Sequence, residues 1–336
     1  MTYQHRTAVL SGLGSWLPPR TVSNHALAER LDTSDEWIRE RTGIVQRHVV
    51  DPGMSTGHLA TEAGARALES ASLDRVDLVL VATTTPDRPC PATAPDVASR
   101  LGMAGTPAFD LAAVCTGFIY GLATANGFIA SGQAKSVLLI AAETFSSILN
   151  PADRSTSVIF GDGAGAVVLR AGDPAEPGAL RAVDLGSDGS LAELIMVPGG
   201  GSLERSSGEP ANPADAYFSM QGKTVYINAV QRMTSSSRLV LDAAGWAPAD
   251  VNAFVAHQAN IKILASVAQR VGIAAERTVI NIDRVANTAA ASVPLALAHA
   301  ASEGRLSLGD RVLLTAFGGG VTWGSAAFEW PDLKPV

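Results

Sequence analysis

Hydrophobic positions along the chain fall into short runs rich in β-branched residues, separated by longer stretches rich in alanine. The short runs predict buried strands at residues 78–83, 136–141, 164–169, 253–256, 278–282 and 311–316. The alanine-rich stretches predict helices at residues 58–71, 95–100, 117–131, 226–244 and 261–271. A glycine follows each of the last three helices, as is typical where a helix ends in the left-handed conformation. The alternation predicts an α/β protein built from layers of helices and largely buried strands.

Two parts of the chain repeat one another in register. Cys115 and Asn287 each precede a glycine by the same number of residues, and an apolar strand follows each glycine. The repeat predicts two related halves, residues 1–175 and 176–336. If these halves pack about an approximate twofold axis, Cys115 from the first half lies close to His257 and Asn287 from the second.

Composition and charge narrow the classes of partner. The chain has 336 residues, with 25 Lys and Arg against 32 Asp and Glu, a net charge of −7, and 47% hydrophobic residues. This composition is typical of a compact globular protein, and its acidic balance offers no basic surface to nucleic acid. The apolar runs are much shorter than the ~20 residues of a membrane span, and glycines and prolines interrupt the apolar stretch near the start. We therefore expect a cytoplasmic protein with no nucleic-acid partner and no membrane partner.

The two cysteines differ in their surroundings. Cys115 stands where an apolar run gives way to a predicted helix, and the small residues Thr116 and Gly117 follow it. A nucleophilic thiolate needs a lowered pKa, which a helix N-terminus favours, so we expect a lowered pKa at Cys115. Its position equally fits a buried cysteine that serves as a small hydrophobic residue. Cys90 lies between two prolines on a stiff loop, without a helix to stabilise a thiolate.

His257 stands where the strand at residues 253–256 gives way to a helix, and Gln258 and Asn260 follow it. Active sites of α/β proteins collect at strand ends, which favours a functional histidine, although a structural one also fits. The sequence contains neither HExxH nor CxxC, so no metal is expected.

Two glycine-rich segments have different interpretations. Residues 161–166 fit a loose dinucleotide-binding pattern, but they lead into a strand and not into the helix that a pyrophosphate needs. A nucleotide cofactor is therefore not expected. Residues 317–320 follow a predicted strand and favour either bare backbone that presents N–H groups to a substrate or a tight turn.

Together these segments resemble the β-ketoacyl-acyl-carrier-protein synthase III enzymes, a family with the thiolase-like fold. The resemblance spans nearly the whole chain and rests on TSDEW at 33–37, RTGI at 41–44, AVCTGF at 113–118, DR at 153–154, FGDGAGA at 160–166, HQAN at 257–260, NTAAASVP at 287–294 and AFGGGVTWGS at 316–325. It implies two pseudo-duplicated halves in a layered αβαβα core, and a homodimer.

The resemblance also implies a catalytic triad of Cys115, His257 and Asn287. A primer acyl-CoA would acylate Cys115, with the N–H groups of Cys115 and Gly319 as the oxyanion hole. Malonyl-acyl-carrier-protein would then lose CO2, with His257 and Asn287 stabilising the enolate oxygen and Phe317 disfavouring the carboxylate. The enolate would attack the acyl group and give a 3-ketoacyl product. Coenzyme A enters as a thioester substrate, and no cofactor is implied.

For the coenzyme, the resemblance implies that Trp37 and Arg154 sandwich the adenine and that Arg41 helps to hold the nucleotide. Gly222 and Asn260 would line the channel for the pantetheine arm.

Three features depart from the usual family pattern. Lys262 stands where arginine is usual; with Arg270 on the same predicted helix it would dock an acidic acyl carrier protein. Cys90 stands where a phenylalanine often meets the acyl group, which favours a larger acyl pocket and a primer larger than acetyl. Residues 199–215 form a longer segment than in compact members and predict a surface loop.

Three hypotheses remain at this point: a decarboxylating enzyme that starts fatty-acid or polyketide chains, an acyltransferase that passes the acyl group to a hydroxyl or carrier thiol without decarboxylation, and a catalytically silent subunit. Asn287 favours the first, because simple transfer needs no enolate stabiliser. Chain-extending relatives use a second histidine where this chain has Asn287. Biosynthetic thiolases need a second reactive cysteine near the C-terminal glycines, and this sequence has no cysteine after Cys115. Neither class therefore fits.

Overall fold

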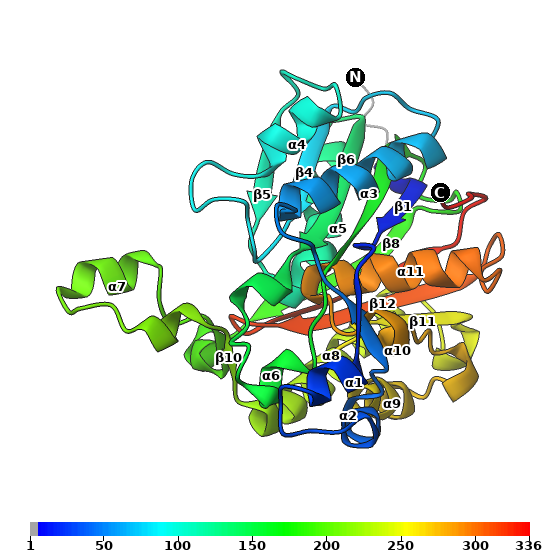
Figure 1. Ribbon diagram of the computed structural model, residues 1–336. Helices are drawn as coiled ribbons and strands as arrows, with labels where there is room; N and C mark the ends of the chain where they lie inside the picture. Colours follow the sequence, from blue (N-terminus) through cyan, green and yellow to red (C-terminus); the bar gives the residue numbers. More distant parts are fainter. Residues whose placement is uncertain (1–5) are drawn as a thin grey trace.

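The computed structural model describes residues 6–336 and contains two mixed sheets (Figure 1). The first sheet has five strands, in the order β1 (Thr7–Trp16), β7 (Gly163–Gly172), β6 (Ser136–Glu143), β4 (Leu78–Ala82) and β5 (Ala108–Leu111). The second has four strands, in the order β8 (Leu180–Ser187), β13 (Thr322–Glu329), β12 (Arg311–Gly318) and β11 (Ala253–Ala256).

The two sheets share one topology. In the first, β1, β7 and β6 pair antiparallel, and β6, β4 and β5 pair parallel. In the second, β8, β13 and β12 pair antiparallel, and β12 and β11 pair parallel. The place of β5 is taken in the second sheet by a single parallel bridge between Phe254 and Thr278. The order and direction of the strands are therefore those of a pseudo-duplicated protein.

The strand predicted at residues 278–282 does not form. The Gln258 side chain accepts from the Asn281 N–H and donates to the Val279 carbonyl, so it takes backbone groups that a strand would need. The chain then turns directly into α10 (Ile282–Val285).

Helices form three layers around the sheets. α5 (Gly117–Ala130) and α11 (Ser292–Ser302) lie between them, and their side chains share one core with strands of both. α3 (Thr56–Ser70) and α4 (Ala94–Arg100) cover the outer face of the first sheet. α8 (Gly222–Ala244) and α9 (Ile261–Val271) cover the outer face of the second (Figure 1). This is the αβαβα core of the thiolase-like fold. The five predicted helices are confirmed within a few residues at either end.

β1 was not predicted because two glycines interrupt its apolar pattern. An added Cβ at Gly12 would lie 2.4 Å from the Ala67 carbonyl oxygen, and one at Gly14 would lie 2.3 Å from the Ala67 nitrogen. The glycines therefore permit α3 to pack directly on the strand.

Short elements surround this core. The elements α1 (Asn24–Ala28), α2 (Asp35–Thr42), β2 (Thr21–Ser23) and β3 (Gln46–His48) lie near α9 and α10. Helix α6 (Arg154–Ser157) lies beside α2, where Arg154 contacts Trp37. β9 (Ile195–Met196) pairs with β10 (Ser219–Met220). The segment at residues 199–215, predicted as a surface loop, carries α7 (Ser202–Ser207) and projects from the body (Figure 1). Within residues 6–336 no helix is both long enough and apolar enough to cross a membrane.

Candidate active site

Cys115 lies in the 3-10 helix η1 (Val114–Thr116), between β5 and the N-terminus of α5. Its side chain is buried, with 7% exposed. Val114 has a φ of 48°, a backbone conformation that costs free energy in a β-branched residue and persists only where the surrounding structure holds it. The N-terminus of α5 carries a partial positive charge, so the turn places Sγ where a developing negative charge is stabilised.

The resting thiol is protonated. Burial raises the pKa of Cys115, and the nearby carboxylate of Glu143 raises this pKa further. The lowered pKa expected from the sequence is therefore wrong, because the pattern shows a helix start but not the loss of water around it.

His257 follows β11 directly and is buried, with 3% exposed. Its Nδ1 lies 2.5 Å from the hydroxyl oxygen of Ser292, the first residue of α11. Burial lowers the pKa of His257 to about 3, so the imidazole is neutral at physiological pH.

Asn287 is held by backbone contacts with the first half of the chain. Its N–H donates to the Ile159 carbonyl and its carbonyl accepts from the Gly161 N–H, both at 3.0 Å. Its side-chain Oδ1 accepts from the Ala289 N–H at 2.9 Å, which leaves the Nδ2 donors for the cavity that Asn287 lines. Ala286, immediately before Asn287, has a φ of 61°, as Val114 has a positive φ immediately before Cys115.

Cys115, His257, Asn287 and Phe317 line one cavity of about 40 Å³. The other lining residues are all apolar: Val114, Phe145, Phe160, Ile195, Phe218, Met220, Val225, Ala229, Met233, Ala259 and Ile263. Phe145 and Phe160 stack with ring centroids 4.2 Å apart. Phe218 meets both of them edge-on, at 5.0 and 5.1 Å. The structure thus brings the three polar residues predicted as a triad to one apolar site.

The glycines after Phe317 pack against the turn that carries Cys115. A Cβ at Gly318 would lie 2.7 Å from the backbone nitrogen of Cys115. A Cβ at Gly319 would lie 3.0 Å from the Ile195 carbonyl oxygen and 3.3 Å from Val114 Cγ2. The sequence analysis interpreted residues 317–320 as bare backbone or a tight turn, and it gave a separate role only to Gly319.

Glu143, at the end of β6, was also missed. Its carboxylate accepts from the Thr84 N–H at 3.0 and 3.1 Å and from the Thr85 hydroxyl at 2.8 Å. The backbone of Ala290 also bonds to it. Burial raises the pKa of Glu143 to about 7. The available signal was an acidic residue at the end of an apolar strand, which is where polar site residues collect in this fold class.

Trp37 lies between two arginines. The guanidinium of Arg41 is 4.9 Å from the ring centroid of Trp37, and that of Arg154 is 5.1 Å from it. Arg154 is also bonded to Asp32, through its carbonyl and through its carboxylate. The space predicted for adenine between Trp37 and Arg154 is therefore filled by Arg154 itself.

The residues predicted for the pantetheine channel do not line the cavity at Cys115. Asn260 caps α9, with Oδ1 accepting from the Lys262 N–H at 2.8 Å, and its amide donates to the Arg41 carbonyl at 2.9 Å. Its amide is thus used to join α9 to α2. Gly222 begins α8, and an added Cβ there would meet nothing within 4 Å.

Lys262 and Arg270 are both exposed on α9. Cys90, predicted to line the acyl pocket, is exposed and does not line the cavity. Its loop is anchored by Asp87, which accepts from the Gly57 N–H of α3 at 2.8 Å. The interpretation of Cys90 as a pocket residue is therefore wrong for the single chain.

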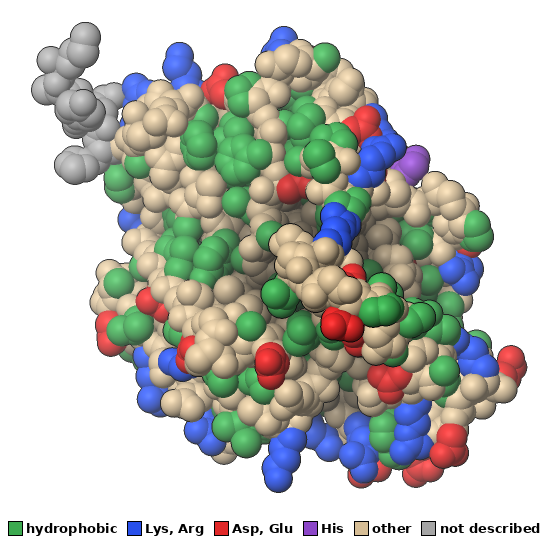
Figure 2. All heavy atoms as spheres, turned by 90° about the vertical axis from the view of Figure 1, so that its left-hand side faces the viewer, with side chains coloured by type: hydrophobic (Ala, Val, Ile, Leu, Met, Phe, Trp, Pro, Cys, Tyr) green, Lys and Arg blue, Asp and Glu red, His purple; other side chains and the backbone are tan. Residues whose placement is uncertain are grey.

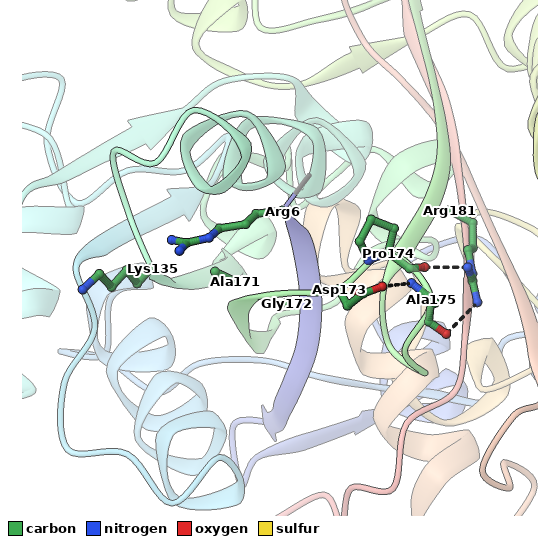
Figure 3. A pocket seen from close by; sticks show the side chains of 8 residues that line it. All are labelled: Arg6, Lys135, Ala171, Gly172, Asp173, Pro174, Ala175 and Arg181. Atoms are coloured by element: carbon green, nitrogen blue, oxygen red, sulfur yellow. Dashed lines mark hydrogen bonds between the residues drawn. The ribbon is translucent and has the colours of Figure 1, made fainter. Parts of the chain in front are cut away.

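A larger concavity, of about 910 Å³, lies elsewhere and shares no lining residue with the cavity at Cys115. Figure 3 shows the side chains of Arg6, Lys135 and Arg181 around the turn at residues 171–175. The lining of this concavity contains no Cys, Ser, Thr or His side chain. Within residues 6–336 no group of three or more His, Cys, Asp or Glu side chains is placed to hold a metal ion.

Comparisons with known proteins match this chain over almost its whole length. The 3-oxoacyl-[acyl-carrier-protein (ACP)] synthase III family matches residues 109–189, and its C-terminal part matches residues 241–330. A beta-ketoacyl-[acyl-carrier-protein] synthase III of Streptomyces coelicolor is 62% identical over 98% of both chains. One of Pseudomonas aeruginosa is 54% identical, over 98% of this chain and 99% of its own.

Solved structures also match this chain over almost its whole length. The crystal structure of 3-oxoacyl-(acyl carrier protein) synthase III from Pseudomonas aeruginosa has a TM-score of 0.91 and 52% identity, over 98% of this chain and 100% of that chain. A priming beta-ketosynthase of a polyketide biosynthetic pathway has a TM-score of 0.91 and 32% identity, over 98% of both chains.

Proposed function

The chain belongs to the 3-oxoacyl-[acyl-carrier-protein] synthase III family, and from this premise we propose how its residues divide the reaction. It is an acyltransferase of the condensing type, which joins a primer acyl group to a malonyl unit on acyl carrier protein. The observation that carries the proposal is the placement of Cys115, His257, Asn287 and Phe317 around one buried apolar cavity.

In the first half-reaction, Sγ of Cys115 attacks the thioester carbonyl of a primer acyl-CoA. The N–H groups of Cys115 and Gly319 stabilise the oxyanion, and the N-terminus of α5 adds its partial positive charge. The C–S bond to coenzyme A breaks, and coenzyme A leaves with the proton from the thiol. The products are acyl-Cys115 and free coenzyme A.

In the second half-reaction, a malonyl thioester on acyl carrier protein loses CO2. The electron pair of the broken C–C bond forms an enolate, whose oxygen accepts hydrogen bonds from His257 and Asn287. Phe317 offers the carboxylate no polar partner and so favours neutral CO2. The enolate carbon attacks acyl-Cys115, the thiolate leaves and is reprotonated, and 3-ketoacyl-acyl-carrier-protein is released. These steps need no metal and no nucleotide cofactor.

Coenzyme A binds at Trp37, Arg41 and Arg154. Trp37 is half-buried and already stacked by both guanidinium groups, so adenine takes the place of one arginine on the ring. The pantetheine arm passes Gly222 and Asn260. Lys262 and Arg270, exposed on α9, supply positive charge to the acidic carrier protein.

The primer is an uncharged aliphatic acyl group, because the side chains around Cys115 other than the triad are all apolar. Cys90 does not line this cavity in the single chain, so the hypothesis of a primer larger than acetyl stays a prediction. The cavity of about 40 Å³ admits a longer chain only if Phe218 or another lining side chain moves. A panel of acyl-CoA thioesters, with acylation of Cys115 followed by intact mass, measures the accepted chain length.

The protein is a homodimer through the edge of the first sheet. β5 pairs on one side with β4, and within the described chain its other edge is unpaired although its residues are half-buried. An edge strand of this kind pairs readily with a second copy. The face that carries β5 and α7 shows scattered hydrophobic side chains (Figure 2). Light scattering with size-exclusion chromatography tests this state, and a monomer at micromolar concentration overturns it.

Release of labelled CO2 from carboxyl-labelled malonyl-acyl-carrier-protein tests the condensation itself. We expect CO2 release that depends on a primer acyl-CoA and is lost in Cys115→Ala together with acylation. Acyl transfer without CO2 release would support simple acyl transfer to another acceptor instead.

A further inference from the structure

Ser292 is a buried hydroxyl for which the mechanism has as yet no role. We propose that it is a positioning residue that holds His257 in the tautomer with its proton on Nε2. His257 then serves as a hydrogen-bond donor during decarboxylation and cannot accept the proton of Cys115. The inference rests on the proposed function for its catalytic consequence, but not for the tautomer itself.

The Ser292 hydroxyl is buried and makes two hydrogen-bond contacts. Ser292 is fully buried, and its Oγ lies 2.5 Å from Nδ1 of His257. The backbone N–H of Gln258 donates to the same oxygen at 3.3 Å. Within the described chain these are the two hydrogen bonds of this hydroxyl, one from a backbone donor and one to the imidazole.

The donor and acceptor count selects one arrangement. The Gln258 N–H can only donate, so it uses a lone pair of Oγ, and the Ser292 proton still needs an acceptor. Nδ1 of His257 is the acceptor within reach, and it accepts only when it carries no proton. The ring proton of the neutral imidazole then lies on Nε2. The opposite tautomer would leave the Ser292 proton buried without a partner, which is costly in free energy.

The surrounding structure fixes this pair. The Gln258 amide donates to the Ala256 and Val279 carbonyls and accepts from the Asn281 N–H, so Gln258 is held on three sides. Ser292 begins α11, five residues after Asn287, on the segment that presents the second donor. Asn287 likewise has its acceptor atom occupied and its donors left for the cavity. His257 and Asn287 can therefore both act as hydrogen-bond donors to the enolate oxygen.

The tautomer of His257 affects the two half-reactions differently. An Nε2–H donor stabilises the enolate oxygen that forms when CO2 leaves. It cannot take the Cys115 proton, which leaves with coenzyme A. Loss of the Ser292 hydroxyl should therefore impair decarboxylation and condensation, and leave acylation of Cys115 nearly unchanged.

The test compares Ser292→Ala with Ser237→Ala. Ser237 is fully buried on α8, but its hydroxyl has no hydrogen-bond partner among the described residues, so it controls for removing a buried oxygen. NMR of the enzyme labelled with ¹⁵N-histidine reports which ring nitrogen carries the proton, and His257→Gln identifies the signals. Acylation of Cys115 by acetyl-CoA is followed by intact mass, and CO2 release from labelled malonyl-acyl-carrier-protein is followed separately.

We expect the wild type to carry the proton on Nε2 and Ser292→Ala to show a mixture of tautomers. The rate of CO2 release should fall about tenfold or more in Ser292→Ala. This loss is smaller than the roughly 10²–10³-fold loss that follows when a direct hydrogen-bond donor is removed, because His257 itself is still present. Acylation should change less than about twofold, and Ser237→Ala should match the wild type in all three measurements. A wild-type proton on Nδ1, or an equal fall in both half-reactions, overturns the proposal. The wild-type spectrum decides this even if Ser292→Ala does not fold. Wild-type acylation without CO2 release would instead refute the proposed function.

Discussion

Gly318 leaves no room for a side chain beside Cys115: a Cβ there would lie 2.7 Å from the Cys115 backbone nitrogen. That nitrogen is one of the two donors proposed for the oxyanion hole. The end of β12 and the start of α5 therefore meet through bare backbone, and the position of the Cys115 N–H depends on a residue from the other half of the chain.

Replacing Gly318 with alanine should displace this N–H group and slow acylation of Cys115. We expect a loss of about 10²–10³-fold, the usual effect of removing one oxyanion donor. Gly127→Ala is the matched control, because Gly127 lies on α5 and an added Cβ there meets nothing within 4 Å. The rate is measured by intact mass with acetyl-CoA. A Gly318→Ala enzyme as fast as Gly127→Ala would show that the close contact is unimportant.

Trp37→Ala should raise KM for acyl-CoA about tenfold, because the ring is the stacking surface proposed for adenine. The same variant should use an acyl-pantetheine, which has no nucleotide, as well as the wild type does. Trp246→Ala removes a tryptophan that also has an arginine, Arg311, over its ring at 5.3 Å, and should leave KM unchanged. Equal losses on acyl-CoA and acyl-pantetheine would place the coenzyme elsewhere.

Phe218→Ala should shift primer preference toward longer acyl chains, because it removes one ring of the cluster beside Cys115. The ratio of kcat/KM for hexanoyl-CoA over acetyl-CoA should rise about tenfold or more, since each buried methylene contributes about 0.8 kcal/mol. Phe328→Ala also empties a buried aromatic site but does not line the cavity. Phe328→Ala should therefore lower the thermal midpoint but keep the wild-type ratio of kcat/KM for hexanoyl-CoA over acetyl-CoA. If Phe218→Ala also keeps that ratio, Phe218 does not border the acyl pocket.

Glu143→Gln should change how stability depends on pH. In the folded protein burial raises the pKa of Glu143 from 4.5 to about 7, so the folded state binds the proton more tightly than the unfolded state. The stabilisation is complete below pH 4.5 and is lost as pH rises to about 7, by ~3 kcal/mol over that window. Urea unfolding from pH 4.5 to 8 should show this fall in the wild type relative to Glu143→Gln. Parallel curves for the two proteins would contradict the raised pKa.

Local features of the sequence were enough to place most elements and to single out Cys115 as a candidate nucleophile. Apolar periodicity located five helices and five strands, because burial of one face imposes its spacing on the chain. The turn before α5 distinguished Cys115 from Cys90, since a strand that runs into a helix is a local arrangement. The family resemblance added the three polar residues that the structure brings to one cavity.

Only the tertiary structure decided what surrounds these residues. The raised pKa of Cys115 comes from burial and from Glu143, and the orientation of His257 comes from Ser292 on another element. Arg154 fills the place expected for adenine, and Cys90 is exposed and does not line the cavity of the single chain. Each depends on contacts between residues far apart in the chain. Local periodicity determines which groups are buried, but desolvation and hydrogen-bond partners are set when the two halves pack together.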